Sequence, residues 1–285
     1  MAGSKKVYAG KPAASFKFKN IKYVKKSYKS YITINREKVL NSLDLTTIRE
    51  LTTAYKDSAW DDDISVIILT GAGKRAFSTG ADLNEQKEYF LGNPNDYYKW
   101  MYEFIQLHEV MRNVGKPTIA RLNGIVVGGG NELNMSCDLA IAAEHVYIRQ
   151  VGAARGSVAA AGATQFLPIM VGDRRAREIL FLCEEIPAQK ALEWGLVNQV
   201  VPLAELDKAV DEMAEKLHNK LPECLRYTKQ QLNFWRDLSW HTTIGHARDW
   251  LSIHNLSFEV EEGIKSFSEK RPVNYKKVRN RKSKK

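Results

Sequence analysis

The sequence predicts an α/β fold, and three features of the chain support this prediction. Strand-like and helix-like segments alternate through roughly the first two thirds of the 285 residues, which is the pattern of α/β packing. Residues 65–70 form an uninterrupted apolar run rich in β-branched side chains, as in strands that are buried on both faces. From Leu203 to about Phe267 the pattern is helical, so we expect a late helical layer.

The individual elements follow in order along the chain. Residues 16–24 alternate apolar and basic side chains and residues 30–35 are β-prone, which predicts a pair of strands. Asp44 is a good cap for a helix to Trp60, in which Leu45, Ile48, Leu51 and Tyr55 share one face. Other expected strands are residues 116–122, 139–142, 146–149 and 197–201; other expected helices are residues 97–114, 130–137, 163–170, 173–183 and 187–194, and one that begins at Pro222.

Positive charge is concentrated at the two ends of the chain. Residues 1–30 carry +9 and residues 265–285 carry another +9, so residues 31–264 carry −8 of the total of +10. Blocks of one charge are typical of solvated tails. We therefore expect a disordered basic tail at 1–15, a core at 16–202, a helical region at 203–267 and a second basic tail at 268–285.

Several classes of protein are disfavoured by the sequence. The chain has no apolar run long enough to span a membrane and no secretory signal, so we expect a cytoplasmic protein. Cys137, Cys183 and Cys224 lie far apart, which is typical of free thiols in a reducing compartment. No metal site is expected, because His241 and His246 are five residues apart and do not share a helical face. The full spacing of a phosphate-binding loop or of a dinucleotide fingerprint is also missing.

Two glycine-rich corners are the most informative feature for function. Residues 77–82 read Phe-Ser-Thr-Gly-Ala-Asp, and residues 128–133 read Gly-Gly-Gly-Asn-Glu-Leu. Glycines expose backbone N–H groups to a ligand, and two such corners can hold one oxyanion together. Glu132 would stand beside that oxyanion as a group that moves protons. Helix capping alone is the plainer interpretation of Glu132.

At these corners the chain resembles the crotonase (enoyl-CoA hydratase/isomerase) superfamily. Residues 74–83 resemble its first oxyanion-hole segment and residues 121–133 resemble its second, with residues 137–142 continuing it. Residues 188–198 and Val200-Val201-Pro202 are similar to its helical signature. The resemblance covers about residues 20–272.

The resemblance implies a fold, a substrate class and a site. The fold is a superhelix of ββα units with a C-terminal α-helical region that forms trimers, often paired into hexamers. The substrate is an acyl-CoA thioester, and no cofactor is bound permanently. The N–H groups of Ala81 and Gly129 would hold the thioester oxygen, with Glu132 as the catalytic base. The implied CoA or substrate contacts are Lys74, Ser78, Gly80, Asp82, Leu83, Gly128, Gly152 and Ser157.

Gly152 stands where simple hydratases of this superfamily carry a second glutamate. Two branches have glycine there: the dihydroxynaphthoyl-CoA synthases, where bicarbonate can replace the acid, and the ring-opening hydrolases of oxocyclohexene-carbonyl-CoA. Residues 162–170 resemble the hydrolases most, although a long insertion after residue 202 is missing. The synthase branch has an aspartate where this chain has Ala159. Gly152 could serve close packing or leave room for a bulky acyl group, and Ser157 could bond the substrate or simply be exposed.

The resulting hypothesis is addition of water to a cyclic or bulky α,β-unsaturated acyl-CoA through a thioester enolate. Opening of a ring by a second water is a further option within it. The alternatives are ring closure as in the dihydroxynaphthoyl-CoA synthases and a non-catalytic RNA-binding crotonase homologue, since basic ends attract polyanions. Aromatic residues for base stacking are sparse in the C-terminal tail, where only Tyr275 is present, so nucleic acid is the less favoured partner.

Overall fold

Successive strands of this chain are shared between two sheets. In the computed structural model, which describes residues 9–280, one sheet has the strand order β1-β2-β3-β5-β7-β10 and the other has the order β4-β6-β8-β9. The pairs β1–β2 and β8–β9 are antiparallel, and the other neighbouring strands are parallel. The strands are β1 (Ile21–Lys26), β2 (Lys29–Ile34), β3 (Val66–Gly71), β4 (Ala76–Ser78), β5 (Thr118–Leu122), β6 (Ile125–Val127), β7 (Leu139–Ala143), β8 (Tyr147–Arg149), β9 (Ile186–Pro187) and β10 (Gln199–Val201).

The chain repeats a unit of two strands, one in each sheet. β3 lies in the larger sheet and β4 in the smaller, and the pairs β5–β6 and β7–β8 repeat this division. Every residue of β3 is buried, as expected for a parallel strand covered on both faces. This arrangement confirms the predicted α/β class and its ββα units.

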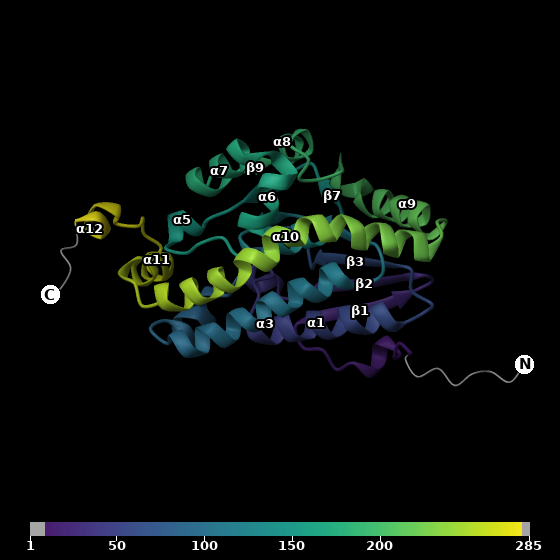
Figure 1. The fold of residues 1–285 in the computed structure, drawn as a ribbon, viewed down its shortest axis with the longest axis horizontal. Coiled ribbons are helices and arrows are strands. Elements are labelled where there is room, and N and C mark those ends of the chain that lie inside the picture. Colours follow the sequence, from purple (N-terminus) through teal and green to yellow (C-terminus); the bar gives the residue numbers. More distant parts are fainter. Residues whose placement is uncertain (1–8, 281–285) are drawn as a thin grey trace, which may run out of the picture.

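Helices surround the two sheets (Figure 1). The longest, α10, lies against α3 and α6, and α3 in turn packs on α1. The α-helices are α1 (Leu45–Trp60), α2 (Leu83–Glu85), α3 (Pro94–Asn113), α4 (Gly129–Ser136), α5 (Gly152–Arg155), α6 (Ala163–Val171), α7 (Asp173–Leu182), α8 (Ala188–Glu193), α9 (Leu206–His218), α10 (Pro222–His254), α11 (Phe258–Ser268) and α12 (Tyr275–Arg279). Short 3-10 helices are η1 (Ala13–Ser15), η2 (Glu37–Val39) and η4 (Leu203–Glu205), and η3 (Gln86–Phe90) is a π-helix.

Two predicted helix starts are confirmed. The Asp44 carboxylate accepts a 2.7 Å hydrogen bond from the Thr47 N–H, so it caps α1. Pro222 occupies the first turn of α10, where its missing N–H costs no helical hydrogen bond.

The first strand begins later than the sequence predicts. β1 starts at Ile21 rather than at Phe16. The N–H groups of Lys19 and Asn20 donate to the Glu50 carboxylate at 2.7 and 2.8 Å, and so are not available to a neighbouring strand. Phe16 instead stacks on Phe18, with ring centroids 5.1 Å apart. The apolar alternation of these residues therefore reflects aromatic packing.

The two ends of the chain are only partly described. Of the tails expected at 1–15 and 268–285, residues 1–8 and 281–285 lie outside the described residues. The N–H of Lys11 donates to Asp57 Oδ1 at 2.7 Å, and α12 forms within the C-terminal stretch. Within residues 9–280, no helix is both long and apolar enough to cross a membrane.

A ladder of polar side chains fastens α10 to the core. Lys229, Asn233 and Asp237 follow one another at intervals of four residues, and all three are buried. Lys229 Nζ donates to Asp138 Oδ2 at 2.8 Å, and Asn233 Nδ2 donates to the Arg112 carbonyl at 2.7 Å. Asp237 forms a buried ion pair with the Arg112 guanidinium. The ladder thereby holds the C-terminal end of α3 against α10.

We expect Asp237→Ala to lower the free energy of unfolding by about 3 kcal/mol, because it leaves the buried Arg112 charge without its partner. Asp249→Ala on the same helix is the control, since Asp249 is 59% exposed in its pair with Arg248 and such pairs contribute about 0.5 kcal/mol. Urea unfolding measures both values. Equal losses for the two variants would contradict a structural role for the buried pair.

Candidate functional site

The first glycine corner is held in place by the segment that precedes α1. The Leu43 N–H donates to the Gly80 carbonyl at 2.8 Å, and the Asp82 N–H donates to the Leu43 carbonyl at 3.0 Å. These two bonds use the groups on either side of Ala81. Within residues 9–280 the Ala81 N–H itself donates no hydrogen bond, so it is available to a ligand.

Asp82 anchors this corner from inside the protein. Its carboxylate caps α2 by accepting from the Asn84 N–H at 3.0 Å and pairs with Arg36 Nη2 at 2.8 Å. Burial alone would raise the pKa of Asp82, but the bond and the charge of Arg36 outweigh it, and the net shift is downward. A buried carboxylate with these partners fixes the corner and leaves little capacity for CoA. Its predicted CoA contact stays a prediction.

The second glycine corner opens helix α4. Gly128 adopts φ 54° and ψ −120°, a conformation that favours glycine, and precedes the first helical residue, Gly129. The first N–H groups of a helix have no partner within the helix. Within the described part of the chain the Gly129 N–H donates to no acceptor, as with Ala81.

The two corners touch each other through bare backbone. A Cβ atom at Gly80 would lie 2.7 Å from the Gly129 nitrogen, and one at Gly129 would lie 3.3 Å from the Gly80 Cα. A Cβ at Gly130 would overlap the Ser78 carbonyl. Glycine is therefore required at positions 80 and 130, whereas a Cβ at Gly129 would be tightly packed. It brings together two amides that the sequence separates by almost fifty residues.

Glu132 lies buried one turn into α4. Its Oε1 accepts a 2.9 Å hydrogen bond from the Ala160 N–H. Burial raises the pKa of Glu132 to about 8, against an ordinary value of 4.5, and the Ala160 bond opposes this rise only in part. The charge of Glu132 contributes, after burial, to the raised pKa of Tyr97 on α3, so Tyr97 faces the same interior. Glu132 can thus gain or lose a proton near neutral pH.

Gly152 is closely packed. A Cβ atom there would lie 2.9 Å from the Ser157 carbonyl oxygen and 3.1 Å from the Ala159 nitrogen. The Ser157 N–H also donates to the Gly152 carbonyl at 2.9 Å. Of the two interpretations of Gly152, close packing therefore has a direct structural basis. Ser157 itself is exposed.

The other predicted binding residues differ in accessibility. Lys74 is exposed on the turn before β4, and its carbonyl contacts His145 Nε2 at 3.2 Å. Ser78 is fully buried, and its hydroxyl accepts from the Gly80 N–H at 3.2 Å. Leu83 is half-buried at the start of α2. The roles of these residues in binding remain predictions.

Sequence reasoning missed three neighbours of the site. Arg36 anchors Asp82, the Phe104 ring lies 3.1 Å from a Cβ built on Gly129, and the Ala160 N–H binds Glu132. Each comes from a segment far away in the sequence and from a residue type with no motif of its own. No local pattern could have identified them.

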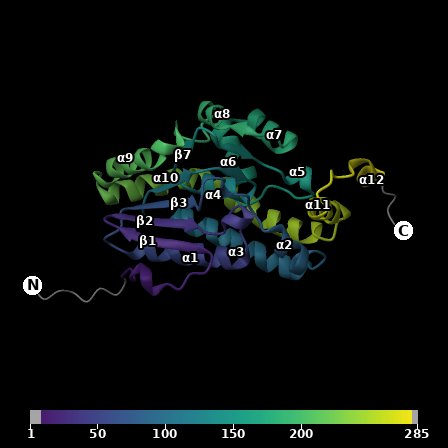
Figure 2. The ribbon, with the colours of Figure 1, turned by 180° about the vertical axis from the view of Figure 1, so that it is seen from behind.

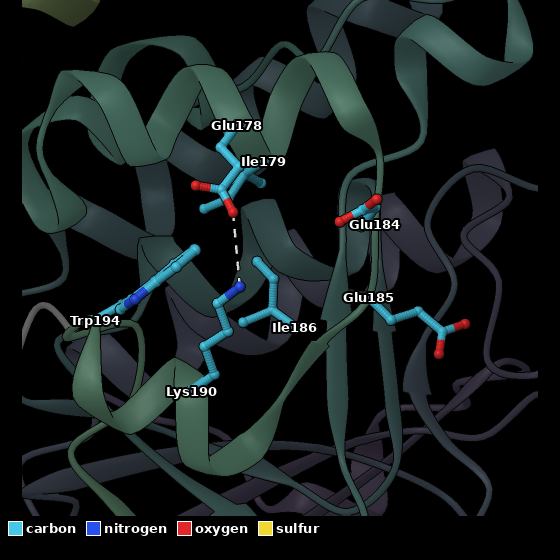
Figure 3. A pocket seen from close by; sticks show the side chains of 7 residues that line it. All are labelled: Glu178, Ile179, Glu184, Glu185, Ile186, Lys190 and Trp194. Atoms are coloured by element: carbon cyan, nitrogen blue, oxygen red, sulfur yellow. Dashed lines mark ion pairs between the residues drawn. The ribbon is translucent and has the colours of Figure 1, made fainter.

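The hollow in Figure 3 is not the site. It lies between α7, β9 and α8, has a volume of about 10 Å³, and is crossed by the ion pair of Lys190 and Glu178 at 3.6 Å. A volume of this size holds about one water molecule at most. None of the predicted site residues lines it. In residues 9–280, His, Cys, Asp and Glu side chains also form no group that could hold a metal ion.

The arrangement at the corners can polarise a carbonyl and move a proton. Two unpaired amides from separate corners can donate to one oxygen, and each such donor is worth roughly 3–4 kcal/mol when charge develops there. A buried carboxyl with a pKa of about 8 is suited to accept a proton and return it. This is the chemistry of an enolate formed beside a thioester or a similar carbonyl.

We expect Gly80→Ala to lower turnover of acyl-CoA esters by about 100-fold or more, because the new methyl group pushes the Gly129 amide away. Gly195→Ala is the control. Its φ of 79° equals that of Gly80, but the nearest atom to a new Cβ there is at an ordinary 3.5 Å. Both variants carry similar backbone strain. Equal turnover by the two would show that the close approach of the corners is dispensable.

Comparisons with known proteins agree with this geometry. The chain is 28% identical to the 6-oxocyclohex-1-ene-1-carbonyl-CoA hydrolase of Geobacter metallireducens, in an alignment that covers 85% of this chain and 76% of that protein. Two enoyl-CoA hydratase crystal structures have similar folds. That from Mycobacterium avium subsp. paratuberculosis has a TM-score of 0.82 at 26% identity, and that from Bacillus anthracis has 0.73 at 32%; each alignment covers 90% of this chain and 98% of the other.

The family model described as enoyl-CoA hydratase/isomerase matches residues 27–279. This range includes both glycine corners, Glu132 and the C-terminal helices, and the predicted resemblance is confirmed. The chain therefore belongs to the enoyl-CoA hydratase/isomerase family, the crotonase-type acyl-CoA enzymes.

Proposed function

We propose that this enzyme adds water to an α,β-unsaturated acyl-CoA thioester. The observation that carries the proposal is the buried Glu132 on the same short helix as the unpaired Gly129 amide, with the Ala81 amide beside it. The Ala81 and Gly129 amides would bind the thioester oxygen. Glu132 would act on water and on the adjacent carbons.

The proposed reaction needs a single acid–base group. The Glu132 carboxylate takes a proton from water as the water oxygen bonds to the β-carbon, and the C=C electrons move onto the thioester oxygen. The two amides stabilise that enolate oxygen. Glu132 then returns its proton to the α-carbon, the C=O bond re-forms, and one water has been added with all atoms accounted for.

The packing of Gly152 supports a role for Glu132 without a second acid. A larger residue at position 152 would require the Ser157–Ala159 backbone to move, so a second glutamate has no place there as the chain stands. A group that must both accept and donate a proton works best with a pKa near the operating pH. The raised pKa of Glu132 fits this demand.

The similarity to the Geobacter hydrolase favours a cyclic substrate as a more specific candidate. In that case a second water would attack a ring ketone next to the α-carbon after the first addition. Cleavage of the C–C bond between them would leave a new carboxylate, with the electron pair on the thioester enolate, which then takes up a proton at the α-carbon. A ring-forming reaction of the naphthoyl-CoA type, with bicarbonate in place of the missing acid, is the remaining alternative from the sequence. Hydration alone, hydration with ring opening, and ring formation differ in their products.

Incubation with linear and cyclic enoyl-CoA esters, with products followed by mass, distinguishes these outcomes. A gain of one water with the ring intact supports hydration, and a gain of two waters with a new carboxylate supports ring opening. Turnover that requires added bicarbonate supports the third alternative. No turnover of any ester, together with salt-sensitive retention on RNA, would overturn the proposal in favour of a binding protein.

We expect Glu132→Gln to lower turnover by about 100-fold or more, the usual effect of losing a general base. The amide keeps an oxygen that can accept from the Ala160 N–H, so the affinity for CoA esters should change little. Glu109→Gln is the control: Glu109 accepts from Gln106 at 2.8 Å on α3 and lies outside the site. Unchanged turnover in Glu132→Gln would eliminate Glu132 as the base.

The raised pKa of Glu132 also predicts two pH dependences. kcat/KM should rise by about tenfold per pH unit below a midpoint near 8 and level off above it, because the base must be ionised. Between about 4.5 and 8 the folded protein binds a proton that the unfolded chain has released, so the free energy of unfolding falls as pH rises. In Glu132→Gln this side chain does not titrate, so this fall in the free energy of unfolding is absent.

The stability advantage of Glu132→Gln over the wild type should therefore grow from pH 5 to pH 8. Urea titrations at several pH values measure it. A constant difference in unfolding free energy, or a kcat/KM that declines as pH rises toward 8, would contradict an ionisable Glu132 that acts as a base.

We also propose self-association to a trimer or hexamer through α10. The face of α10 that packs on the core bears the polar ladder and Trp240, and the opposite face exposes apolar side chains. Contiguous exposed apolar surface is typical of interfaces. Sedimentation equilibrium distinguishes the two assemblies. The exposed apolar residues on this face of α10 are Tyr227, Phe234, Trp235, Leu238 and Ile253.

A further inference from the structure

Helix α11 lies directly beside the segment that supplies the hydrogen-bond donor to Glu132. We call residues 151–160 the α5 segment; it contains α5 and ends at Ala160. α11 and α5 are in contact, and they lie side by side in both views of the fold (Figures 1 and 2). A C-terminal helix therefore borders the site from the side of Glu132.

The two elements meet backbone to backbone. A Cβ atom at Gly263 on α11 would overlap the Arg155 carbonyl, and a Cβ at Gly156 would overlap the Glu259 carbonyl. Each element thus contributes a glycine where the other presents a peptide group. No side chain fits between them at these two positions, so bulk added at Gly263 would push α11 and the α5 segment apart.

The chain beyond α11 strengthens this contact. The buried Glu262 carboxylate accepts from both terminal nitrogens of Arg271, at 2.5 and 3.0 Å, and from the Asn274 N–H at 2.9 Å. The Arg271 bond lowers the pKa of Glu262 to about 2. The Tyr275 hydroxyl then donates to the Ala154 carbonyl at 3.3 Å. The C-terminal stretch is therefore folded back onto the α5 segment.

The residues just before α11 are also bonded to the turn that leads into α3. Asn255, between α10 and α11, accepts a 2.9 Å hydrogen bond from the Gly92 N–H through its Oδ1 atom. Gly92 lies in the turn that leads into α3, which carries Tyr97. The residues that lead into α11 are therefore bonded to the turn before α3.

We propose that α11 is a positioning element for Glu132, which holds the α5 segment where the Ala160 N–H reaches Glu132 Oε1. This rests on the proposed function, in which Glu132 moves the proton. Gly263 is the central positioning residue, because its lack of a side chain sets the distance between α11 and the α5 segment. The C-terminal end of the chain would thus control the proton affinity of a group in the core.

Few interactions set the pKa of Glu132, so loss of the Ala160 hydrogen bond should be detectable as a change in that pKa. Tyr97 on α3 is close enough for the charge of Glu132 to add to the effect of burial on its raised pKa, and the α5 segment presents the Ala160 amide. Among the described residues no charged side chain contributes to the shift of the Glu132 pKa, which comes from burial and the Ala160 bond alone. Loss of that bond removes the one interaction that favours the carboxylate. The pKa of Glu132 must then rise further.

The test is the pH profile of Gly263→Ala in the full chain. We expect the midpoint of kcat/KM to move upward by about one pH unit, since a hydrogen bond to a charged group is lost. Gly245→Ala makes the same change within α10, where a new Cβ meets no atom within 4 Å, and should keep the wild-type midpoint. Exchange of the Ala160 amide with deuterium should accelerate only in Gly263→Ala.

An unshifted midpoint and unchanged Ala160 exchange in Gly263→Ala would overturn the proposal. If that variant does not fold, Glu262→Gln weakens the same contact through Arg271 and is expected to accelerate Ala160 exchange; unchanged exchange there would count equally against it. Glu132→Gln separates the two ideas. If it keeps full turnover the proposed function fails, whereas if it is inactive while Gly263→Ala behaves like the wild type, only the role of α11 fails.

Discussion

The contact between the two glycine corners is the constraint on which the rest of the site depends. Gly80 and Gly129 approach so closely that a methyl group on Gly80 would lie 2.7 Å from the Gly129 nitrogen. β4 and β6 are parallel neighbours in the smaller sheet and deliver the two corners to the same edge. The bonds of Leu43 then occupy the groups around Ala81 and leave its amide unpaired. A fold of repeated ββα units thereby brings together two unpaired amides from distant parts of the sequence.

Burial of Glu132 follows from the same geometry and gives the site its chemistry. The helix that begins at Gly129 turns Glu132 inward, where loss of water raises its pKa to about 8. Among residues 9–280 its carboxylate accepts one hydrogen bond, from the Ala160 N–H. A charged partner would hold the carboxylate ionised and remove its capacity to return a proton. Two helices after residue 203 pack on segments next to the site, since α10 is hydrogen-bonded to α3 and α11 contacts the backbone of the α5 segment.

The sequence predicts the fold class and both corners because their signals are local. Apolar strands, the Asp44 cap and the glycine runs each occupy a few adjacent residues. The predicted start of β1 was wrong because the apolar positions of Phe16 and Phe18, which resemble the alternation of a strand, reflect the stacking of the two rings on each other. The bonds of Ala160 to Glu132 and of Arg36 to Asp82 could not be predicted, since each joins residues about thirty or more positions apart with no motif of their own. These two bonds form only because the fold packs distant segments of the chain together.

The most direct measurement of the central claim is the carbonyl stretch of a bound acyl-CoA whose thioester carbonyl carries a carbon-13 label, observed by difference infrared spectroscopy. Two amides that point at one oxygen withdraw electron density from the C=O bond. The account predicts a stretch at lower frequency than that of the same ester in water, with the shift reduced in Gly80→Ala. A frequency equal to or higher than the value in water would show that the Ala81 and Gly129 amides do not hold the thioester oxygen.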